Sequence, residues 1–314
     1  MFENLKVRKS LLRSVKILTL IVILWLFYTQ ISRFTTKELA ELHIERLDYL
    51  IYAVLLLLVN WGLEFFKWRW TVSCISAKPL SKNVLISMLA GIATGIVTPN
   101  RIGNFIGRML YFKGGMRGFL IMGTLYGNLA QFISTIFFGV IGFFALGTSV
   151  LNEYFSELSQ IIGVFFSVVS LFIYLFYPFL PIRKIKLFKR YLNLISSFQQ
   201  IAKKLLLPLL LLSVLRYLVF VFQFTLLLIA FGATYSHDLI NGLYVMFFIT
   251  TLIPSFILGK LFIRETVSML IIGALVPNIA IVITASLTLW LINLGIPSLV
   301  GYYFLSRSKL KEYV

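Results

Sequence analysis

The chain has few of the residues on which a soluble enzyme depends. Charged side chains make up only 13% of its 314 residues, the acidic residues number 11, and there is a single cysteine. So little polar surface cannot cover a soluble globular protein, and one cysteine excludes an intrachain disulfide and a cysteine-rich metal site. The sequence also contains no P-loop, no HExxH, no GxSxG and no paired acidic motif of a metal-dependent glycosyltransferase. We therefore expect neither an enzyme nor a cofactor.

Apolar residues dominate instead. They make up 60% of the sequence, and the mean hydropathy is +0.95, so we expect an integral membrane protein. Lysine and arginine outnumber the acidic residues by 29 to 11, an excess that in a soluble domain would indicate nucleic acid. In a membrane protein, basic residues gather in cytoplasmic loops and near anionic lipid headgroups. We therefore expect no nucleic-acid partner.

Long apolar stretches predict the fold class. A helix needs ~20 residues to cross a hydrocarbon core of ~30 Å. The first apolar run, Ile17 to Phe27, follows five basic residues, and no small-residue cleavage site comes after it, so we expect a retained span and not a signal peptide. The prediction is an all-α polytopic membrane protein, a single transmembrane domain over residues 1 to 314. Its six full spans are expected at about 12 to 31, 47 to 66, 118 to 147, 159 to 181, 205 to 231 and 278 to 305.

Two further apolar regions, about 83 to 113 and 239 to 276, are each interrupted near the middle by a proline beside charged residues. Their uninterrupted pieces are short, because residues 84 to 98 as a helix would extend only ~22 Å. Matched interrupted segments in two halves of a chain indicate the substrate path of an internally repeated transporter. The first break reads Thr98-Pro99-Asn100-Arg101-Ile102-Gly103 and continues to Gly107 and Arg108, and the second reads Ile253-Pro254-Ser255 and continues to Gly259, Lys260, Arg264 and Glu265.

Loop charges give the orientation. Both tails and the connections 67 to 82 and 183 to 204 are basic, whereas the connections 32 to 48 and 148 to 158 are acidic. Basic loops stay in the cytoplasm under the positive-inside rule. Both termini are therefore predicted to be cytoplasmic.

This orientation predicts two opposed re-entrant helical hairpins. Both ends of the first broken region fall on the cytoplasmic side, and the second broken region must enter from the opposite face. Equivalent elements begin at about 47 and 205, 83 and 239, and 118 and 278, which are offsets of 158, 156 and 160 positions. These offsets predict an inverted internal repeat with halves of about 12 to 147 and 159 to 305. The basic segment 182 to 204 between the halves suits an interfacial amphipathic helix or, alternatively, a solvated linker.

Arginines near the first break are the main candidates for substrate contacts. Irregular backbone at membrane depth is tolerated only where protein or a water-filled cavity satisfies its polar groups. A guanidinium there offers a planar, permanently charged fork that suits a phosphodiester. Arg101 and Arg108 are assigned this role, with snorkelling to the cytoplasmic surface as the alternative. Arg216, inside the span 205 to 231, is a third candidate.

Arg264 and Glu265 form the charged pair of the second break. Adjacent residues on a helix diverge by roughly 100°, so we expect that these two do not simply neutralise each other. Glu265 could instead pair with Arg101 or bind a cationic headgroup. The alternative is a structural salt bridge between the two hairpins.

A group of tryptophans and charged residues closes the second predicted span. Such side chains are enriched where helices meet lipid headgroups. We interpret the group as an interfacial belt; it comprises Trp61, Glu64, Lys67, Trp68, Arg69 and Trp70.

The two broken motifs together resemble the transmembrane region of the lysylphosphatidylglycerol synthase/flippase family. The likeness covers residues 12 to 305. It implies a multi-pass module of a bacterial or archaeal inner (cytoplasmic) membrane that moves aminoacylated phospholipid between leaflets. The family commonly has an acid where this chain has Asn104, and its second motif is usually richer in glycine. Residue by residue, the resemblance assigns importance to Pro99, Arg101, Gly103, Arg108, Pro254, Gly259, Arg264 and Glu265.

The sequence thus leads us to expect a flippase-like transporter for a phospholipid or aminoacyl-phospholipid headgroup. No synthase activity is expected from a chain that ends at Val314. The alternative is a non-catalytic membrane subunit that anchors or regulates a separate lipid-modifying enzyme or glycosyltransferase through its basic cytoplasmic face. The predicted substrate contacts are Arg101, Arg108, Arg216, Arg264 and Glu265, and the predicted hairpin breaks are Pro99, Asn100, Gly103, Gly107, Pro254, Ser255 and Gly259.

Overall fold

The regular structure of the described residues is entirely helical. The computed structural model describes residues 21, 43–76, 80–96, 98, 101–150, 157–180, 192–253, 259–276 and 278–307, and these residues include no strand. Four of their helices are long and apolar enough to cross a membrane. At this level the predicted all-α membrane protein is confirmed. The four helices are Leu47–Ile75, Gly114–Leu146, Leu192–Ala230 and Ile279–Arg307.

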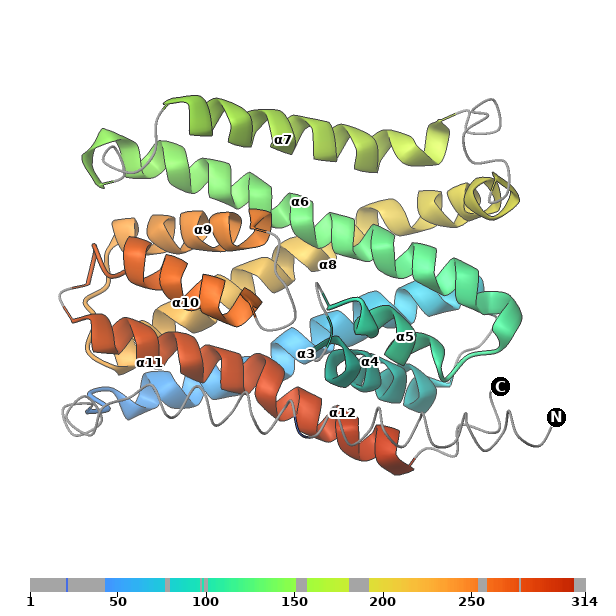
Figure 1. Ribbon diagram of the computed structural model, residues 1–314, viewed down its shortest axis with the longest axis horizontal. Helices are drawn as coiled ribbons and strands as arrows, with labels where there is room; N and C mark the ends of the chain where they lie inside the picture. Colours follow the sequence, from blue (N-terminus) through green and yellow to red (C-terminus); the bar gives the residue numbers. More distant parts are fainter. Residues whose placement is uncertain are drawn as a thin grey trace.

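These four helices match four of the six predicted spans. In Figure 1 they are α3 (Leu47–Ile75), α6 (Arg117–Val150), α8 (Leu192–Ala230) and the joined helices α11 (Ile279–Trp290) and α12 (Ile296–Arg307).

The other two predicted spans have different outcomes. The predicted span 12 to 31 lies outside the described residues. The prediction at 159 to 181 corresponds to α7 (Glu157–Phe176) and a 3-10 turn (Tyr177–Phe179), within which Val164–Phe179 is a shorter apolar helix. The α-helix ends here because Pro178 has no backbone N–H to continue the hydrogen-bond ladder.

Helix α8 begins earlier than the sequence predicts. It runs without interruption from Leu192, so residues 192 to 204 belong to the same helix as the predicted span, and residues 182 to 191 lie outside the described part of the chain. The added turns are stabilised by burial, because Phe198 and Ala202 are fully buried among side chains of α6 and α7. Their core cluster also contains Tyr126 and Tyr174, whose rings stack with centroids 4.4 Å apart.

Each of the two broken regions forms two short helices. The first region gives α4 (Ser81–Ile96) and α5 (Gly103–Met109), and the second gives α9 (His237–Leu252) and α10 (Gly259–Ile271). The predicted breaks at Gly103 and Gly259 coincide with the first residues of α5 and α10. The predicted break residues Pro99, Asn100, Pro254 and Ser255 lie outside the described residues.

Glycine allows α4 and α5 to pack closely. A Cβ at Gly103 would collide with the backbone carbonyl of Thr94, and one at Gly107 with the carbonyl of Ala90. The Thr94 hydroxyl donates to the Gly103 carbonyl at 2.6 Å, and the Gly103 N–H donates to Thr98 Oγ1 at 2.7 Å. Gly107, predicted as part of the break, therefore lies inside α5 as a packing contact.

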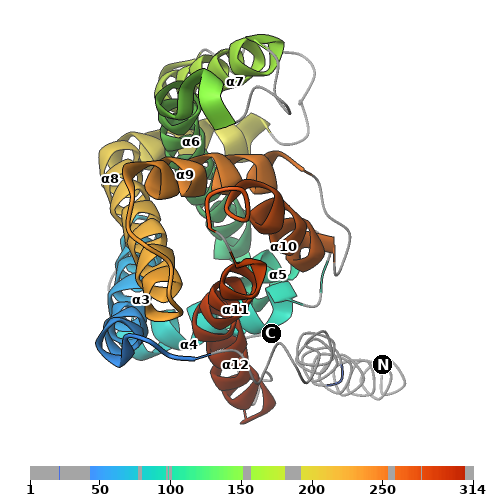
Figure 2. The same cartoon turned by 90° about the vertical axis from the view of Figure 1, so that its left-hand side faces the viewer.

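Helices of the two halves pack against each other. Helix α3 lies along α8, α6 along α9, and α12 along α4, while α7 covers the outer side of α6 (Figures 1 and 2). The largest apolar core lies among α6, α8, α9, α10 and α11. A second core lies among α3, α4, α5 and α12. Polar side chains are buried between these two cores, where α3, α5 and α8 meet.

Candidate functional site

The inward face of α3 carries the central polar residues of the site. Its buried residues recur every three or four positions and include Asn60, Glu64 and Lys67, which is the spacing of one helix face. Glu64 and Lys67 are only 9% and 6% exposed. The interpretation of these two as part of an interfacial belt is therefore wrong, whereas Arg69 is exposed on the outer face.

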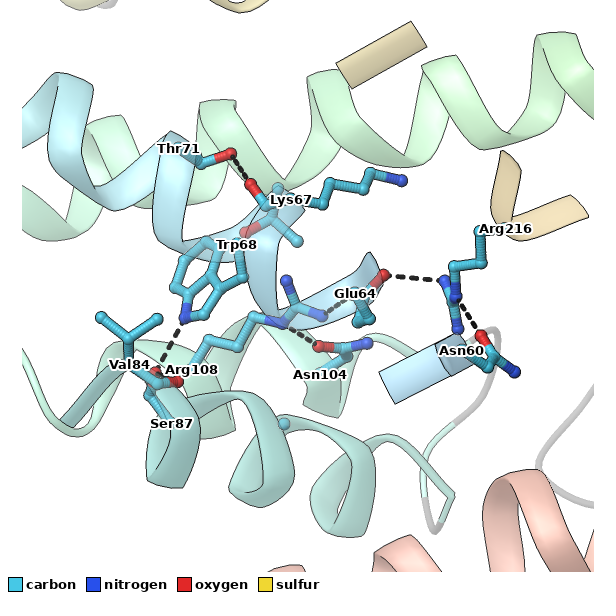
Figure 3. A network of polar contacts seen from close by, with 12 residues as sticks. Asn60, Glu64, Lys67, Trp68, Thr71, Val84, Ser87, Asn104, Arg108 and Arg216 are labelled. Atoms are coloured by element: carbon cyan, nitrogen blue, oxygen red, sulfur yellow. Dashed lines mark hydrogen bonds and ion pairs between the residues drawn. The ribbon is translucent and has the colours of Figure 1, made fainter. Parts of the chain in front are cut away.

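Glu64 binds two of the predicted arginines. One carboxylate oxygen accepts a hydrogen bond from Arg108 Nη2 of α5, and the other accepts from Arg216 Nη1 of α8 at 2.8 Å. Figure 3 shows Glu64 between the two guanidinium groups. Arg108 is 6% exposed, so it points into the protein and does not snorkel. Three helices are thus joined through one carboxylate.

Further contacts fix the position of Arg108. Its Nε donates to Asn104 Oδ1 at 2.7 Å, and its guanidinium lies 4.7 Å from the centre of the Trp68 ring. Trp68 is held in turn, because its Nε1 donates to Ser87 Oγ on α4 at 2.8 Å. These contacts use Nε and Nη2 of Arg108 and fix the plane of its guanidinium, so the group is pre-organised for an incoming anion.

A chain of side-chain hydrogen bonds fixes Arg216. Its Nε donates to Asn60 Oδ1 at 2.8 Å, and Asn60 Nδ2 donates to Asn293 Oδ1 at 2.5 Å. Asn293 Nδ2 donates to Gln223 Oε1 at 2.8 Å, and Gln223 Nε2 donates to the Ala53 carbonyl at 2.7 Å. These bonds connect α3 and α8 to the segment between α11 and α12.

That segment is a π-helical turn, Leu291–Gly295. Asn293 lies inside it and is 7% exposed. Single π-helical turns inside α-helices occur frequently at functional sites. Here the turn belongs to the continuous hydrogen-bond network that reaches Arg216.

Two more cations lie close to this network without a counterion. Arg101, between α4 and α5, is near enough to interact electrostatically with Glu64, Arg108 and Arg216, and so is Lys67. Among the described residues, no hydrogen-bond or ion-pair partner is found for the side chain of either Arg101 or Lys67. We call Glu64, Lys67, Arg101, Arg108 and Arg216 the cationic cluster.

The backbone of Arg101 is strained. Its φ of 58° lies in the left-handed region, and among the described residues it is the one non-glycine with a positive φ. This conformation costs about 1–2 kcal/mol for an L-residue with a Cβ. Strained residues cluster at binding and catalytic sites, where the surrounding structure maintains them.

Arg264 and Glu265 pair with each other, so the expectation that they would not is wrong. Arg264 Nη2 lies 3.0 Å from Glu265 Oε1, because the long arginine side chain reaches around the helix despite the divergence of the two backbone positions. Ser286 of α11 joins the pair: its hydroxyl donates to Glu265 Oε1 at 2.9 Å, and its carbonyl accepts from Arg264 Nη2 at 2.9 Å. Among the described residues, Glu265 makes no ion pair with Arg101 or any other residue of the first hairpin.

The structure therefore brings together three predicted residues and separates two. Arg101, Arg108 and Arg216 share the cationic cluster, whereas Arg264 and Glu265 form a different, neutral pair between α10 and α11. Glu64 and Lys67, on which the cluster depends, were not predicted as site residues. Their spacing was visible, since Asn60, Glu64 and Lys67 recur at one helix face.

The chemistry of the cationic cluster favours anions. Guanidinium and ammonium groups donate charge-assisted hydrogen bonds to phosphate or carboxylate. Within the described part of the chain, no group of three or more His, Cys, Asp or Glu residues could hold a metal ion.

Comparisons of this chain with models of known protein families, with curated proteins and with solved structures found no match.

Proposed function

We propose that the protein is a flippase-like lipid transporter that binds the phosphate of a phospholipid or aminoacyl-phospholipid headgroup at the cationic cluster. The observation that carries this proposal is the surplus of positive charge. Glu64 is shared by Arg108 and Arg216, and it leaves Arg101 and Lys67 uncompensated among the described residues. Lys67 is buried and Arg101 is partly buried, so water and salt screen these charges less than they would at an open surface. A bound phosphate would neutralise these charges and accept their hydrogen bonds.

The proposed architecture has six spans and two opposed re-entrant hairpins. Its support is that α4 and α9 have 16 residues each, α5 has 7 and α10 has 13, which is too short for helices that cross a bilayer, since these need ~20 residues. Each hairpin has a glycine at the start of its second helix and an arginine five residues later. Those arginines, Arg108 and Arg264, are 156 positions apart (264 minus 108).

Helix packing also supports an inverted repeat. Helix α6 of the first half packs on α9 of the second, and α12 of the second half packs on α4 of the first. Within each half, the spanning helix that precedes the hairpin contacts the one that follows it, α3 with α6 and α8 with α11. A two-fold relation between the halves accounts for this correspondence, and transporters with such repeats bind substrate at the repeat interface.

Each residue of the site has a proposed role. Arg108 and Arg216, held by Glu64, bind the phosphate, and Arg101 and Lys67 supply the remaining positive charge. Arg264 and Glu265 stay predicted substrate contacts, but their mutual pairing favours the structural alternative. The acyl chains remain in the lipid of an inner (cytoplasmic) membrane, and both termini lie in the cytoplasm.

Transport in proteoliposomes tests the proposal. We would measure transbilayer movement of fluorescent phosphatidylglycerol, lysyl-phosphatidylglycerol and a polyprenyl phosphate by chemical quenching of the outer leaflet. Wild-type protein is expected to move at least one of these lipids, and Arg101→Ala to abolish the movement while the thermal unfolding midpoint stays close to wild type. Arg69→Ala is the matched control, because Arg69 is exposed.

Two results would contradict the proposal. The first is no movement of any lipid by correctly folded wild-type protein, which would favour a subunit that anchors a separate lipid-modifying enzyme. The second is equal movement by wild type and Arg101→Ala.

A further inference from the structure

The charge of the cationic cluster indicates which kind of phosphate it binds. Arginine stays protonated in proteins, so Arg101, Arg108 and Arg216 carry three fixed positive charges against the single negative charge of Glu64. The fixed net charge is therefore +2, and protonated Lys67 raises it to +3.

The neighbouring helices bring no other acid to this site. Helices α4, α5, α6, α8 and α12 contain no aspartate or glutamate. In α3 the remaining acid is Asp48, which lies near the start of the helix and pairs with Arg46. The additional bases of these helices are exposed or partly exposed: Arg69, Lys82, Arg117, Lys203, Lys204 and Arg307.

Asn104 contributes to the surplus of charge. Its side-chain oxygen accepts a hydrogen bond from Arg108 Nε at 2.7 Å, which is a contact that an aspartate could also make. An aspartate would lower the fixed net charge from +2 to +1. The amide thus positions Arg108 without neutralising it.

We infer that the cationic cluster binds a phosphate monoester in preference to a phosphodiester, so that the transported lipid ends in a terminal phosphate. This inference rests on the proposed function and names its substrate class. A phosphodiester carries one negative charge, whereas a monoester carries close to two above its second pKa of ~6. A dianion therefore neutralises more of the cluster's charge, +2 from the fixed groups and +3 with protonated Lys67, than a monoanion does.

Unused hydrogen-bond donors match the additional oxygen of a monoester. Arg216 uses Nε and Nη1 for Asn60 and Glu64, which leaves its Nη2 without a partner among the described residues. The guanidinium of Arg101 and the ammonium of Lys67 are also without described partners. A phosphate monoester presents three terminal oxygens to such donors.

Ligand-dependent thermal unfolding of the full chain in detergent tests the inference. The probes are phosphatidic acid, which is a lipid monoester, phosphatidylglycerol, which is a diester, and glycerol 3-phosphate, which is a soluble monoester. At pH 7.5 we expect phosphatidic acid to bind roughly tenfold or more tightly than phosphatidylglycerol, because one additional negative charge interacts with the cluster. At pH 5 this preference should shrink, because the monoester gains a proton near pH ~6.

Asn104→Asp sharpens the test. It keeps an acceptor for Arg108 and removes one unit of net positive charge, so the preference for phosphatidic acid should fall by roughly tenfold. Asn104→Ala, which removes the acceptor and adds no charge, should retain the preference. Protonation of Lys67 on going from pH 7.5 to pH 5 would have the opposite effect, because it adds positive charge and strengthens anion binding. Lys67→Met removes this contribution, so the pH dependence of that variant reports protonation of the ligand alone.

Each outcome has a distinct meaning. Equal affinities for the two lipids at both pH values, with Asn104→Asp affecting both equally, would overturn the monoester inference and leave the proposed lipid transporter intact. Binding of neither lipid by folded protein would overturn both. Glycerol 3-phosphate binding as tightly as phosphatidic acid would show that the ligand is a soluble monoester and would overturn the lipid assignment.

Discussion

Arg108 and Arg264 lie at matching positions in two pairs of short helices, α4 with α5 and α9 with α10, and their electrostatic surroundings differ. Each lies five residues after the glycine that begins the second helix of its hairpin. Arg264 has its own carboxylate, Glu265, and the pair is neutral. Arg108 shares Glu64 with Arg216, while Arg101 and Lys67 lie nearby.

We propose that the number of counterions distinguishes a binding site from a structural contact in this protein. A buried pair with balanced charge needs no ligand, and apolar residues can often replace it at no loss of stability. A partly buried cluster with surplus positive charge can instead accept an anion. We therefore propose different roles for the two helix pairs, α4 with α5 and α9 with α10.

The largest expected effect comes from removing the shared carboxylate. Glu64→Gln leaves Arg108 and Arg216 without a counterion, and the loss of a buried ionic partner costs about 3–5 kcal/mol. Glu265→Gln should cost less, about 1–3 kcal/mol, because Arg264 keeps its hydrogen bond to the Ser286 carbonyl. Thermal unfolding followed by circular dichroism measures both. Equal losses would contradict the distinction between the two arginines.

The next effect tests the close packing that brings Arg108 to Glu64. Gly103→Ala places a methyl group against the Thr94 carbonyl, and such overpacking costs about 1–3 kcal/mol. Gly114→Ala is the matched control, because no atom lies within 4 Å of its added Cβ. The unfolding midpoint should fall for the first variant and stay near wild type for the second. A tolerated Gly103→Ala would show that the two helices of the first hairpin can separate.

A smaller effect of opposite sign is expected at Arg101. Arg101→Gly relieves the left-handed strain and should stabilise the fold by about 1 kcal/mol, yet it removes a cation and should abolish lipid movement. Arg101→Ala should abolish movement without that gain in stability. Unfolding and transport measured on the same preparations check this prediction, and continued transport by Arg101→Gly would remove Arg101 from the site.

The smallest effect is expected in the second hairpin. Because the Arg264–Glu265 pair is neutral, the double change Arg264→Met and Glu265→Leu should alter stability by no more than about 1 kcal/mol and should leave lipid movement intact. The transport assay at matched protein density measures it. Loss of movement by a folded double variant would return these residues to the substrate path.

Local sequence signals predicted the helices of the fold more completely than the residues of the candidate site. Long apolar runs and prolines at the breaks predicted α3, α6, α8 and the ends of α4 and α9, because helix length and missing backbone donors act locally. The early start of α8 was not predictable in this way. Burial of Phe198 and Ala202 against other helices extends it, and the sequence shows no partner for them.

The arginines of the candidate site were predicted from the sequence, but their counterion, Glu64, was not. Arg101, Arg108 and Arg216 stood out because charged residues in apolar segments are costly. Glu64 and Lys67 lie beside three tryptophans in the sequence, and that composition concealed their place on the buried face of α3. The pairing of Arg264 with Glu265 was also missed, since backbone angles alone do not show how far an arginine side chain reaches.

Transbilayer movement by Lys67→Met tests the central claim most directly. Lys67 is buried in the cationic cluster and has no counterion among the described residues, and methionine keeps a similar volume without the charge. If surplus positive charge binds the headgroup, Lys67→Met should fold normally and move lipid at least several-fold more slowly, while Arg69→Met on the same helix matches wild type. Wild-type rates for Lys67→Met would contradict the claim.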